Sequence, residues 1–201
     1  METNVLDKLK NLREDAKISN VPILRQKTSE LLGEMVEKLQ PENILEIGTA
    51  IGYSGILMLS KSQNSFLTTI EKDEEVAQIA QKNFEEVGYS DRKKILIGDC
   101  IEFLPKLSEK ERYDFIFLDG PKGQYIKYLP YLLKMLNVNG YLFSDNVLYR
   151  GMVNGKIEVA KSKKTLVKNL RLFLEELDKN IDVEHKVLDI EDGISICKKI
   201  S

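Results

Sequence analysis

The sequence of 201 residues contains no tryptophan, a single histidine and only two cysteines. Cys100 and Cys197 lie far apart and form no C-x-x-C pair, which argues against a zinc site or a disulfide framework and fits a reducing compartment. No apolar run approaches the length of a membrane span, and the start Met-Glu-Thr-Asn has neither the basic nor the apolar segment of a signal peptide. These absences predict a soluble cytoplasmic protein with no membrane partner.

The sequence also lacks the G-x-G-x-x-G turn of dinucleotide-binding domains. In its place, an apolar run from Ile44 leads through Gly48 and Gly52 into a helical pattern at 56–59. Glycines at such a strand-to-helix turn let the backbone approach a ligand, and the next helix points free N–H groups toward it. Glu46 disfavours a pyrophosphate and suits a ligand with an ammonium group. A tight turn without a ligand is the alternative.

The order of apolar patterns predicts an α/β fold. With 42% hydrophobic and 31% charged residues, the chain fits one globular domain, 1–201, with residues 1–40 as an N-terminal helical extension. That extension holds a helix at 3–17, with Thr3 as its cap and Asn20 and Pro22 at its end, and a second helix from about 29 to 39. Strands then alternate with helices, and the predicted strands are 43–47, 66–71, 94–97, 113–119, 140–145, 182–190 and 194–200. Strands that are apolar throughout indicate a parallel sheet with helices on both faces, and Asp192-Gly193 indicates an antiparallel hairpin at the end.

An acid stands at or beside the end of each predicted parallel strand. The carboxyl ends of parallel strands meet at one edge of a sheet, where ligands bind. Glu71 stands where a carboxylate can accept hydrogen bonds from both hydroxyls of a ribose. Any one of these acids can instead cap a helix or a turn. The five are Glu46, Glu71, Asp99, Asp119 and Asp145.

Two neighbouring strand ends offer a cluster of oxygen ligands. Asp119, Asp145 and Asn146 are hard donors with no histidine or thiol nearby, a set that selects magnesium or calcium over zinc or copper. The alternative is that Asp145-Asn146 only shapes a turn. Lys122 can reach the same place as a general base, or it can be a surface lysine or a counter-charge. His185, in a late strand, is predicted to be structural.

The net charge of −2 is distributed unevenly. From residue 122 to residue 171 there are ten basic residues and two acidic ones, so this window carries +8 and the remainder −10. A locally basic surface on an acidic protein suits contact with a phosphate backbone. The alternative is a solvated lysine-rich face, which charge alone favours.

Five motifs in this order resemble the class I S-adenosylmethionine-dependent methyltransferases, specifically the metal-dependent O-methyltransferases of the catechol and caffeoyl-CoA type. The motifs are E-I-G-T-A-I-G-Y-S from Glu46, Ile70-Glu71, Gly98-Asp99-Cys100, Asp119-Gly-Pro-Lys122 and Ser144-Asp145-Asn146. The resemblance covers nearly the whole chain and implies a Rossmann-like sheet of seven strands. The segments that begin at Lys122 and Asp145 are most similar to the bacterial tRNA 5-hydroxyuridine methyltransferases.

The resemblance also implies roles for individual residues. Leu24, Glu46, Gly48 and Ser54 would hold the methionine end of the cofactor, Glu71 its ribose, and Asp99 and Cys100 its adenine. Asp119 would contact the cofactor and would also bind magnesium, together with Asp145 and Asn146. Asp119 and Lys122 would be the catalytic residues. Arg150, Lys156, Lys163, Lys164 and Lys168 are the predicted RNA contacts. Leu24 departs from the methionine that is frequent in the tRNA enzymes, which weakens the assignment of the substrate.

The leading hypothesis is therefore a magnesium-dependent transfer of a methyl group from S-adenosylmethionine to 5-hydroxyuridine in the tRNA anticodon loop. A small-molecule catechol-type enzyme is the rival, although the absence of tryptophan removes one way of walling an aromatic pocket. A noncatalytic RNA-binding protein would have no need for the complete set of Asp119, Lys122, Asp145 and Asn146. A nicotinamide oxidoreductase is disfavoured by the missing glycine fingerprint. The first helix is available for a contact between two copies in a homodimer.

Overall fold

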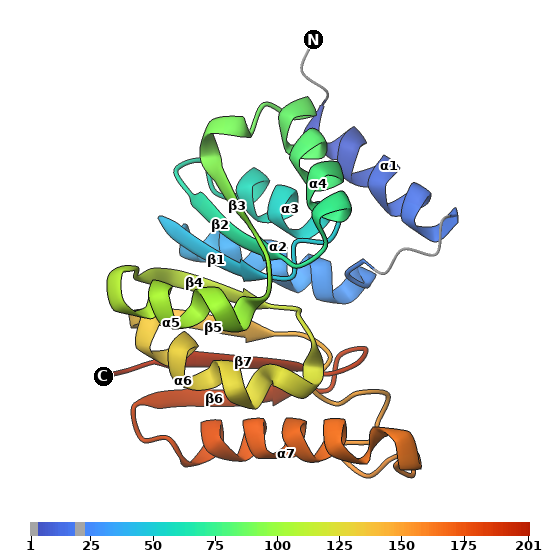
Figure 1. Ribbon diagram of the computed structural model, residues 1–201, viewed down its shortest axis with the longest axis vertical. Coiled ribbons are helices and arrows are strands. Elements are labelled where there is room, and N and C mark those ends of the chain that lie inside the picture. Colours follow the sequence, from blue (N-terminus) through green and yellow to red (C-terminus); the bar gives the residue numbers. More distant parts are fainter. Residues whose placement is uncertain (1–3, 19–22) are drawn as a thin grey trace. The chain divides into compact units, whose positions relative to one another are not determined.

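Strands and helices alternate along the chain in this computed structural model, which describes residues 4–18 and 23–201 (Figure 1). The predicted cap Thr3 and the predicted helix end at Asn20 and Pro22 lie outside the described residues. The chain divides into two compact units, residues 1–100 and 101–201. The assignment of 1–201 to one domain stays a prediction.

The first unit is built on three parallel strands. Its elements are α1 (Val5–Ile18), α2 (Gln26–Leu39), β1 (Asn43–Ile47), α3 (Tyr53–Lys61), β2 (Phe66–Glu71), α4 (Glu74–Glu86) and β3 (Lys93–Ile97). β2 pairs with both β1 and β3, with Ile44 opposite Leu67 and Thr68 opposite Lys94. α1 and α2 both contact α3, and α4 contacts β2 and β3. The carboxyl ends of the three strands therefore lie at one edge.

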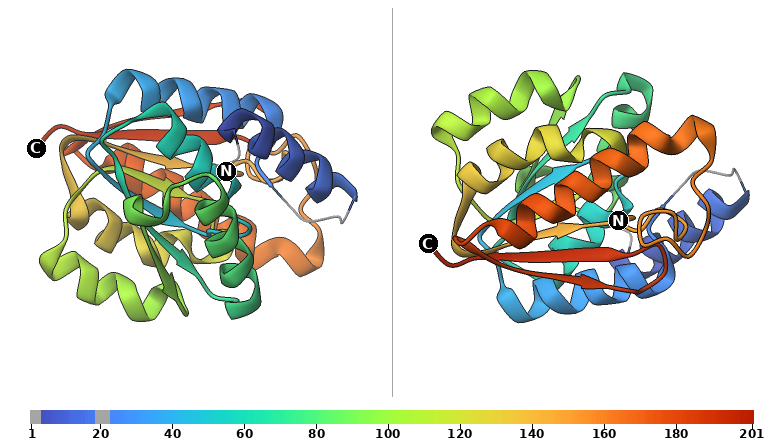
Figure 2. Two further views of the ribbon diagram at one scale, coloured as in Figure 1. Left: turned by 90° about the horizontal axis from the view of Figure 1, so that it is seen from above. Right: turned by 90° about the horizontal axis from the view of Figure 1, so that it is seen from below.

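The second unit carries the remaining strands. Its elements are α5 (Cys100–Lys110), β4 (Tyr113–Leu118), α6 (Tyr125–Met135), β5 (Leu136–Ser144), α7 (Lys164–Lys179), β6 (Val183–Leu188) and β7 (Ile194–Lys199), with 3-10 turns η2 (Lys122–Gln124) and η3 (Lys161–Lys163). β4 and β5 are parallel, while β7 runs antiparallel to β5 and β6. α7 contacts α6 and β6, and Figure 2 shows it beside the β6–β7 hairpin. The rings of Tyr125 and Phe173 meet edge to face at 5.5 Å between their centres.

The seven strands follow the order β3-β2-β1-β4-β5-β7-β6 of one mixed sheet. This confirms the predicted seven-stranded, mostly parallel sheet with a C-terminal antiparallel hairpin. α7 is an amphipathic helix, and it buries Val167, Leu170, Phe173 and Leu177. Within the described ranges, no helix combines the length and hydrophobicity needed to span a bilayer.

Two predicted boundaries were wrong. α2 begins at Gln26 instead of near Ser29, because Arg25 is the extended residue and its carbonyl already accepts from the Ser29 N–H at 2.9 Å. β5 begins at Leu136 instead of Gly140. Its register with β4 jumps from Tyr113 opposite Leu136 to Phe115 opposite Tyr141, so the strand makes an excursion before its regular part.

Candidate active site

The turn after β1 uses two glycines in the left-handed region, Gly48 with φ 99° and Gly52 with φ 87°. The Gly48 N–H donates to the Ile70 carbonyl of β2 at 3.0 Å, which anchors the turn to the neighbouring strand. A Cβ at Gly52 would lie 3.1 Å from the Phe84 ring of α4. A side chain there would be strained in both conformation and space, so the turn requires glycine.

Glu46 lies in the core beneath this turn with 0% of its surface exposed. Its carboxylate accepts hydrogen bonds from the Ser54 hydroxyl of α3 and from the Thr69 hydroxyl of β2, the latter at 2.7 Å. The structure thus brings the predicted residues Glu46 and Ser54 together. A buried carboxylate that is satisfied by hydroxyl donors fixes those donors in place. In this structure Glu46 therefore sets the position of Ser54.

Glu71 connects three backbone segments at the end of β2. Its carboxylate accepts from the N–H groups of Ala50 at 2.9 Å, Lys72 at 2.8 Å and Asp73 at 3.0 Å. Its carbonyl accepts from the Gly98 N–H at 2.8 Å, which joins the ends of β2 and β3. Glu71, the residue predicted to bind the ribose, is therefore held rigidly beside the glycine turn.

Asp99 and Cys100 stand where α5 begins. The Asp99 carboxylate forms an ion pair with Lys72 at 2.9 Å. Cys100 is buried, and burial first, then the Asp99 charge, raises the pKa of its thiol to about 12. A thiol that is neutral at physiological pH can line an apolar surface but is a poor nucleophile or metal ligand.

Arg13 is a residue of this region that sequence reasoning missed. Leu24, a predicted cofactor residue, is buried, and its carbonyl accepts from the Arg13 guanidinium of α1 at 3.0 Å. Arg13 belongs to an amphipathic helix outside the strand–helix repeat, so it counted as an ordinary surface arginine. The available signal was its spacing of four from Leu9 and three from Ala16, two buried residues of α1.

In the second unit, Asp119 follows β4 and meets Lys122 of η2. The Lys122 ammonium donates to Asp119 Oδ1 at 2.6 Å, with both side chains only partly exposed. Burial raises the pKa of the Asp119 carboxyl, and the charge and hydrogen bond of Lys122 act against that rise. The predicted pair of acid and lysine is therefore in direct contact.

Asp145 follows β5, at the next strand end. Its N–H donates to the Leu118 carbonyl at 3.0 Å, and the Tyr125 hydroxyl lies 3.1 Å from that carbonyl oxygen and 3.2 Å from the carbonyl oxygen of Asp145. Burial, followed by the charge of Asp119, raises the pKa of the Asp145 carboxyl to about 7. The two aspartates thus lie within electrostatic reach of each other.

The donor set at these two strand ends fits a hard divalent cation. Among the described residues, no three His, Cys, Asp or Glu side chains are grouped as a metal site. The predicted set has two carboxylates and the side-chain amide of Asn146. The backbone N–H of Asn146 donates to Asp145 Oδ1 at 2.7 Å. Two carboxylates and one lysine leave a net negative charge at these strand ends, which a cation would neutralise.

The β6–β7 turn supports the Asp145 segment in a way that the sequence did not predict. The N–H groups of Val147 and Leu148 donate to the Gly193 and Asp192 carbonyls at 3.0 and 2.9 Å. The Asp192 carboxylate also accepts from the Arg150 N–H at 2.5 Å. Asp192-Gly193, expected only as a hairpin turn, therefore fixes residues 147–150.

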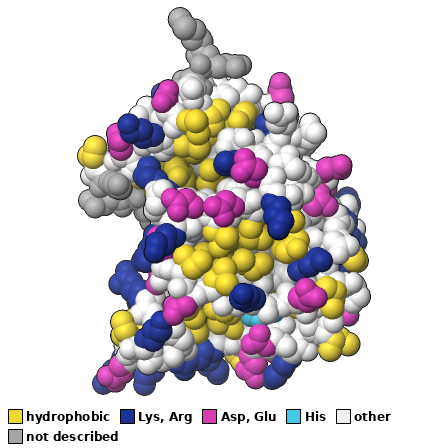
Figure 3. Space-filling model, turned by 180° about the vertical axis from the view of Figure 1, so that it is seen from behind, with side chains coloured by type: hydrophobic (Ala, Val, Ile, Leu, Met, Phe, Trp, Pro, Cys, Tyr) yellow, Lys and Arg dark blue, Asp and Glu magenta, His cyan; other side chains and the backbone are white. Residues whose placement is uncertain are grey.

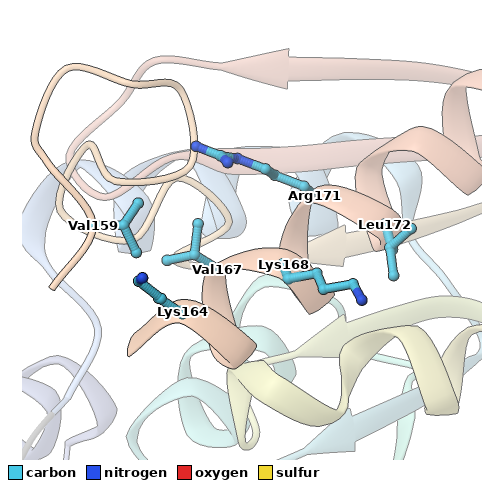
Figure 4. A pocket seen from close by; sticks show the side chains of 6 residues that line it. All are labelled: Val159, Lys164, Val167, Lys168, Arg171 and Leu172. Atoms are coloured by element: carbon cyan, nitrogen blue, oxygen red, sulfur yellow. The ribbon is translucent and has the colours of Figure 1, made fainter. Parts of the chain in front are cut away.

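The predicted RNA residues fall into two groups. Lys163, Lys164 and Lys168 are exposed at the start of α7, whereas Lys156 forms an exposed ion pair with Asp189. Figure 3 shows Lys and Arg side chains gathered at the lower left, on the side where α7 begins. A pocket of about 310 Å³ lies there, and Figure 4 shows the residues that line it: Val159, Lys164, Val167, Lys168, Arg171 and Leu172.

Arg171 links this basic surface to the segment that follows Asp145. Its guanidinium donates to the carbonyls of Met152 and Val153, each at 3.0 Å. The loop is thus fastened to α7 at one end and to Asp192-Gly193 at the other.

His185 is buried in β6 with 2% of its side chain exposed. Its ring nitrogens lie 2.6 Å from Asp178 Oδ1 and 2.9 Å from the buried Ser195 Oγ. Ser195 is fully buried and Asp178 is exposed, so the His185 ring joins the core to the surface, and the Ser195 hydroxyl is closed to a substrate.

Replacing His185 with leucine should lower the free energy of unfolding by about 1–3 kcal/mol, because the Ser195 hydroxyl loses its partner in the core. The double variant His185→Leu/Ser195→Ala should recover much of this loss. Urea unfolding measures both variants. A loss of methyl transfer by folded His185→Leu would contradict the structural role.

Comparisons with known proteins agree with this arrangement. Residues 1–200 match the O-methyltransferase family. A catechol O-methyltransferase of Niastella koreensis is 32% identical over 159 residues, which cover 78% of this chain and 70% of that protein. Caffeoyl-CoA O-methyltransferase 2 of Eucalyptus globulus is 28% identical over 181 residues, covering 86% of this chain and 72% of that protein.

Solved structures give the same result. The O-methyltransferase from Bacillus cereus in complex with SAH (S-adenosylhomocysteine) superimposes with a TM-score of 0.85 at 25% identity, covering 96% of this chain and 90% of that one. A Staphylococcus aureus protein described as a candidate caffeoyl-CoA O-methyltransferase gives a TM-score of 0.87 at 33% identity. The match covers 95% of this chain and 91% of that one. The chain therefore belongs to the O-methyltransferase family, and it is an S-adenosylmethionine-dependent O-methyltransferase.

Proposed function

We propose that this enzyme methylates the hydroxyl oxygen of 5-hydroxyuridine in the tRNA anticodon loop, giving 5-methoxyuridine, with the help of a magnesium ion. The observation that carries the RNA substrate is the basic start of α7, which Arg171 fastens to the segment after Asp145. Exposed lysines on the same unit as the acceptor-side acids suit a phosphate backbone.

Within this proposal, the first unit binds the methyl donor. The glycine turn admits the cofactor, Ser54 and Leu24 meet its methionine end, and Glu71 accepts from its ribose. Asp99 and the neutral Cys100 thiol border its adenine. When bound, the cofactor supplies a methyl group on a positively charged sulfur, which an oxygen nucleophile can attack.

The second unit prepares the acceptor. Asp119, Asp145 and Asn146 would hold the divalent cation, which when bound favours the deprotonated form of a nearby hydroxyl. Lys122 would accept the proton that the hydroxyl loses from its neutral form, and the ammonium that results has a carboxylate partner in Asp119 at 2.6 Å. Tyr125, fully buried, keeps the ends of β4 and β5 together through its hydroxyl.

A small-molecule hydroxyl substrate is the second candidate. It is favoured by the names of the relatives, which specify catechol and caffeoyl-CoA as substrates of those proteins. On this reading the lysines of α7 are a solvated face.

The deciding experiment is methyl transfer from labelled S-adenosylmethionine to tRNA that carries 5-hydroxyuridine, with catechol in a parallel reaction. We expect label in the tRNA that disappears with EDTA and is absent from unhydroxylated tRNA. Label in catechol alone would overturn the RNA substrate and leave the methyltransferase intact. Transfer that is unaffected by EDTA would overturn the metal.

Reversing Lys163, Lys164 and Lys168 to glutamate should weaken tRNA binding roughly tenfold or more at 150 mM salt, because phosphate contacts are lost. The slope of log affinity against log salt should fall by about two to three. Acids suit the first turn of a helix, so the variant should fold. Fluorescence anisotropy with labelled tRNA measures both quantities.

The matched control reverses three exposed lysines elsewhere, Lys10, Lys38 and Lys110, which changes the net charge equally. Equal losses for the two triple variants would mean that net charge, and not the α7 surface, attracts the RNA.

A further inference from the structure

Arg13 joins four segments of the first unit. Its guanidinium donates to the Leu24 carbonyl at 3.0 Å, to the Ser29 hydroxyl of α2 at 2.8 Å and to the Tyr53 hydroxyl of α3. Its carbon Cζ also lies 4.8 Å from the centre of the Tyr53 ring. One positive charge therefore joins α1, the segment before α2, α2 itself and the start of α3.

The acceptors of Arg13 are a carbonyl and two hydroxyls, all neutral. Among the described residues, no carboxylate forms an ion pair with it. A partly buried guanidinium is usually balanced by an anion, because its charge has lost part of its hydration. The missing anion points to a ligand that is negatively charged at this place.

One acceptor of Arg13, the Leu24 carbonyl, belongs to a residue assigned above to the methionine end of the cofactor. A second acceptor of Arg13, Tyr53, stands between Gly52 of the turn and Ser54. Ser54 in turn is held by the buried carboxylate of Glu46. An amino acid carries an ammonium and a carboxylate, and a guanidinium beside this turn suits the carboxylate.

We propose that Arg13 binds the carboxylate at the amino-acid end of S-adenosylmethionine by charge and at the same time orients Leu24 and Tyr53 around it. This inference rests on the proposed cofactor site in the first unit. It gives α1 a role in selecting the cofactor, beyond packing against α3.

Two ligands test the charge separately from the fold. S-adenosylhomocysteine has the amino-acid end, and 5′-methylthioadenosine lacks it but keeps the adenosine. Arg13→Gln should weaken binding of S-adenosylhomocysteine about 10- to 100-fold, as expected for a lost charged hydrogen bond, and leave 5′-methylthioadenosine within about twofold. Arg13→Lys, which keeps the charge and loses the planar fork, should restore part of the preference. Calorimetry at two salt concentrations measures each affinity.

Arg92 provides a matched control in the same unit. Its guanidinium donates to the backbone carbonyls of Ser62 and Ser65 and lies 5.0 Å from the centre of the Tyr89 ring. Arg92→Gln should lower stability and leave the ratio of the two affinities unchanged.

Equal losses for both ligands in Arg13→Gln would overturn the proposal, because they would mean that Arg13 only braces the fold. Unchanged affinity for S-adenosylhomocysteine would overturn it as well. If the wild-type protein bound 5′-methylthioadenosine and S-adenosylhomocysteine equally, the amino-acid subsite itself would fail. If it bound neither, the proposed cofactor site would fail.

Discussion

Replacing Asp145 with asparagine is expected to reduce methyl transfer by roughly a thousandfold and, in EDTA at pH 8, to make the chain more stable. Activity falls because one of two carboxylates proposed for the cation is lost. Stability rises because a buried negative charge beside Asp119 is removed. Loss of function and gain of stability from one substitution is typical of a residue that is retained for chemistry.

The sign of the stability effect follows from the pKa of Asp145. Burial and the Asp119 charge raise this pKa from 3.8 to about 7, so the folded chain binds the proton more tightly than the unfolded chain. The resulting penalty on folding is absent below pH 4 and grows as the pH rises toward 7. Above pH 7 it reaches up to about 4 kcal/mol. The advantage of Asp145→Asn should therefore be largest at pH 8 and fade as the pH falls from 7 to 4.

Urea unfolding of the two proteins in EDTA across this pH range measures the difference. Magnesium should stabilise the wild type and have little effect on Asp145→Asn. Asp189→Asn is the control, since Asp189 is exposed and, among the described residues, its ion pair is with Lys156 at the surface. Asp145→Asn that is less stable than the wild type at pH 8, or that keeps its turnover, would contradict the assignment.

Replacing Gly193 with alanine is expected to cost about 2–5 kcal/mol of stability and most of the activity. Gly193 has φ 86°, and a Cβ there would lie 2.2 Å from Leu148 Cγ. To make room, the hairpin must separate from residues 147–150, which breaks the bonds to the Val147 and Leu148 N–H groups. Asn146 and Asp145 would then lose their support.

Gly155→Ala separates the cost of the positive φ from the cost of the clash with Leu148. Gly155 has a similar φ of 78°, but a Cβ there meets nothing within 4 Å. It should therefore show only the smaller conformational cost, about 1 kcal/mol. Adding Leu148→Ala to Gly193→Ala should recover part of the stability. Equal costs for Gly193→Ala and Gly155→Ala in thermal unfolding would show that the contact with Leu148 is unimportant.

The sequence predicted the strands and the sheet because these depend on local patterns. Apolar runs such as 43–47 and 66–71 are short, continuous and bounded by turn residues, and they match β1 and β2. The acids at their ends could be placed together because parallel strands finish at one edge of a sheet. Lys122 could be paired with Asp119 because the two residues are three positions apart in the sequence.

What the sequence did not predict depends on partners far apart in the chain. The contact of Arg13 with Tyr53 spans 40 residues, and that of Arg150 with Asp192 spans 42. No periodicity predicts such contacts, since Arg13 also fits an exposed position and Arg150 makes its contact through its backbone N–H. The early part of β5 was missed for a similar reason, because its excursion is defined by its pairing with β4 and not by its own residues.

The two cysteines are reporters of local opening at two places in the chain. Cys100 closes the first unit and Cys197 lies in β7 of the second, and burial raises the pKa of each thiol to about 12. Alkylating reagents attack thiolates, so both sites are protected while the fold is closed. The rate at which each cysteine becomes labelled therefore measures how often the structure around that cysteine opens, without any engineered probe.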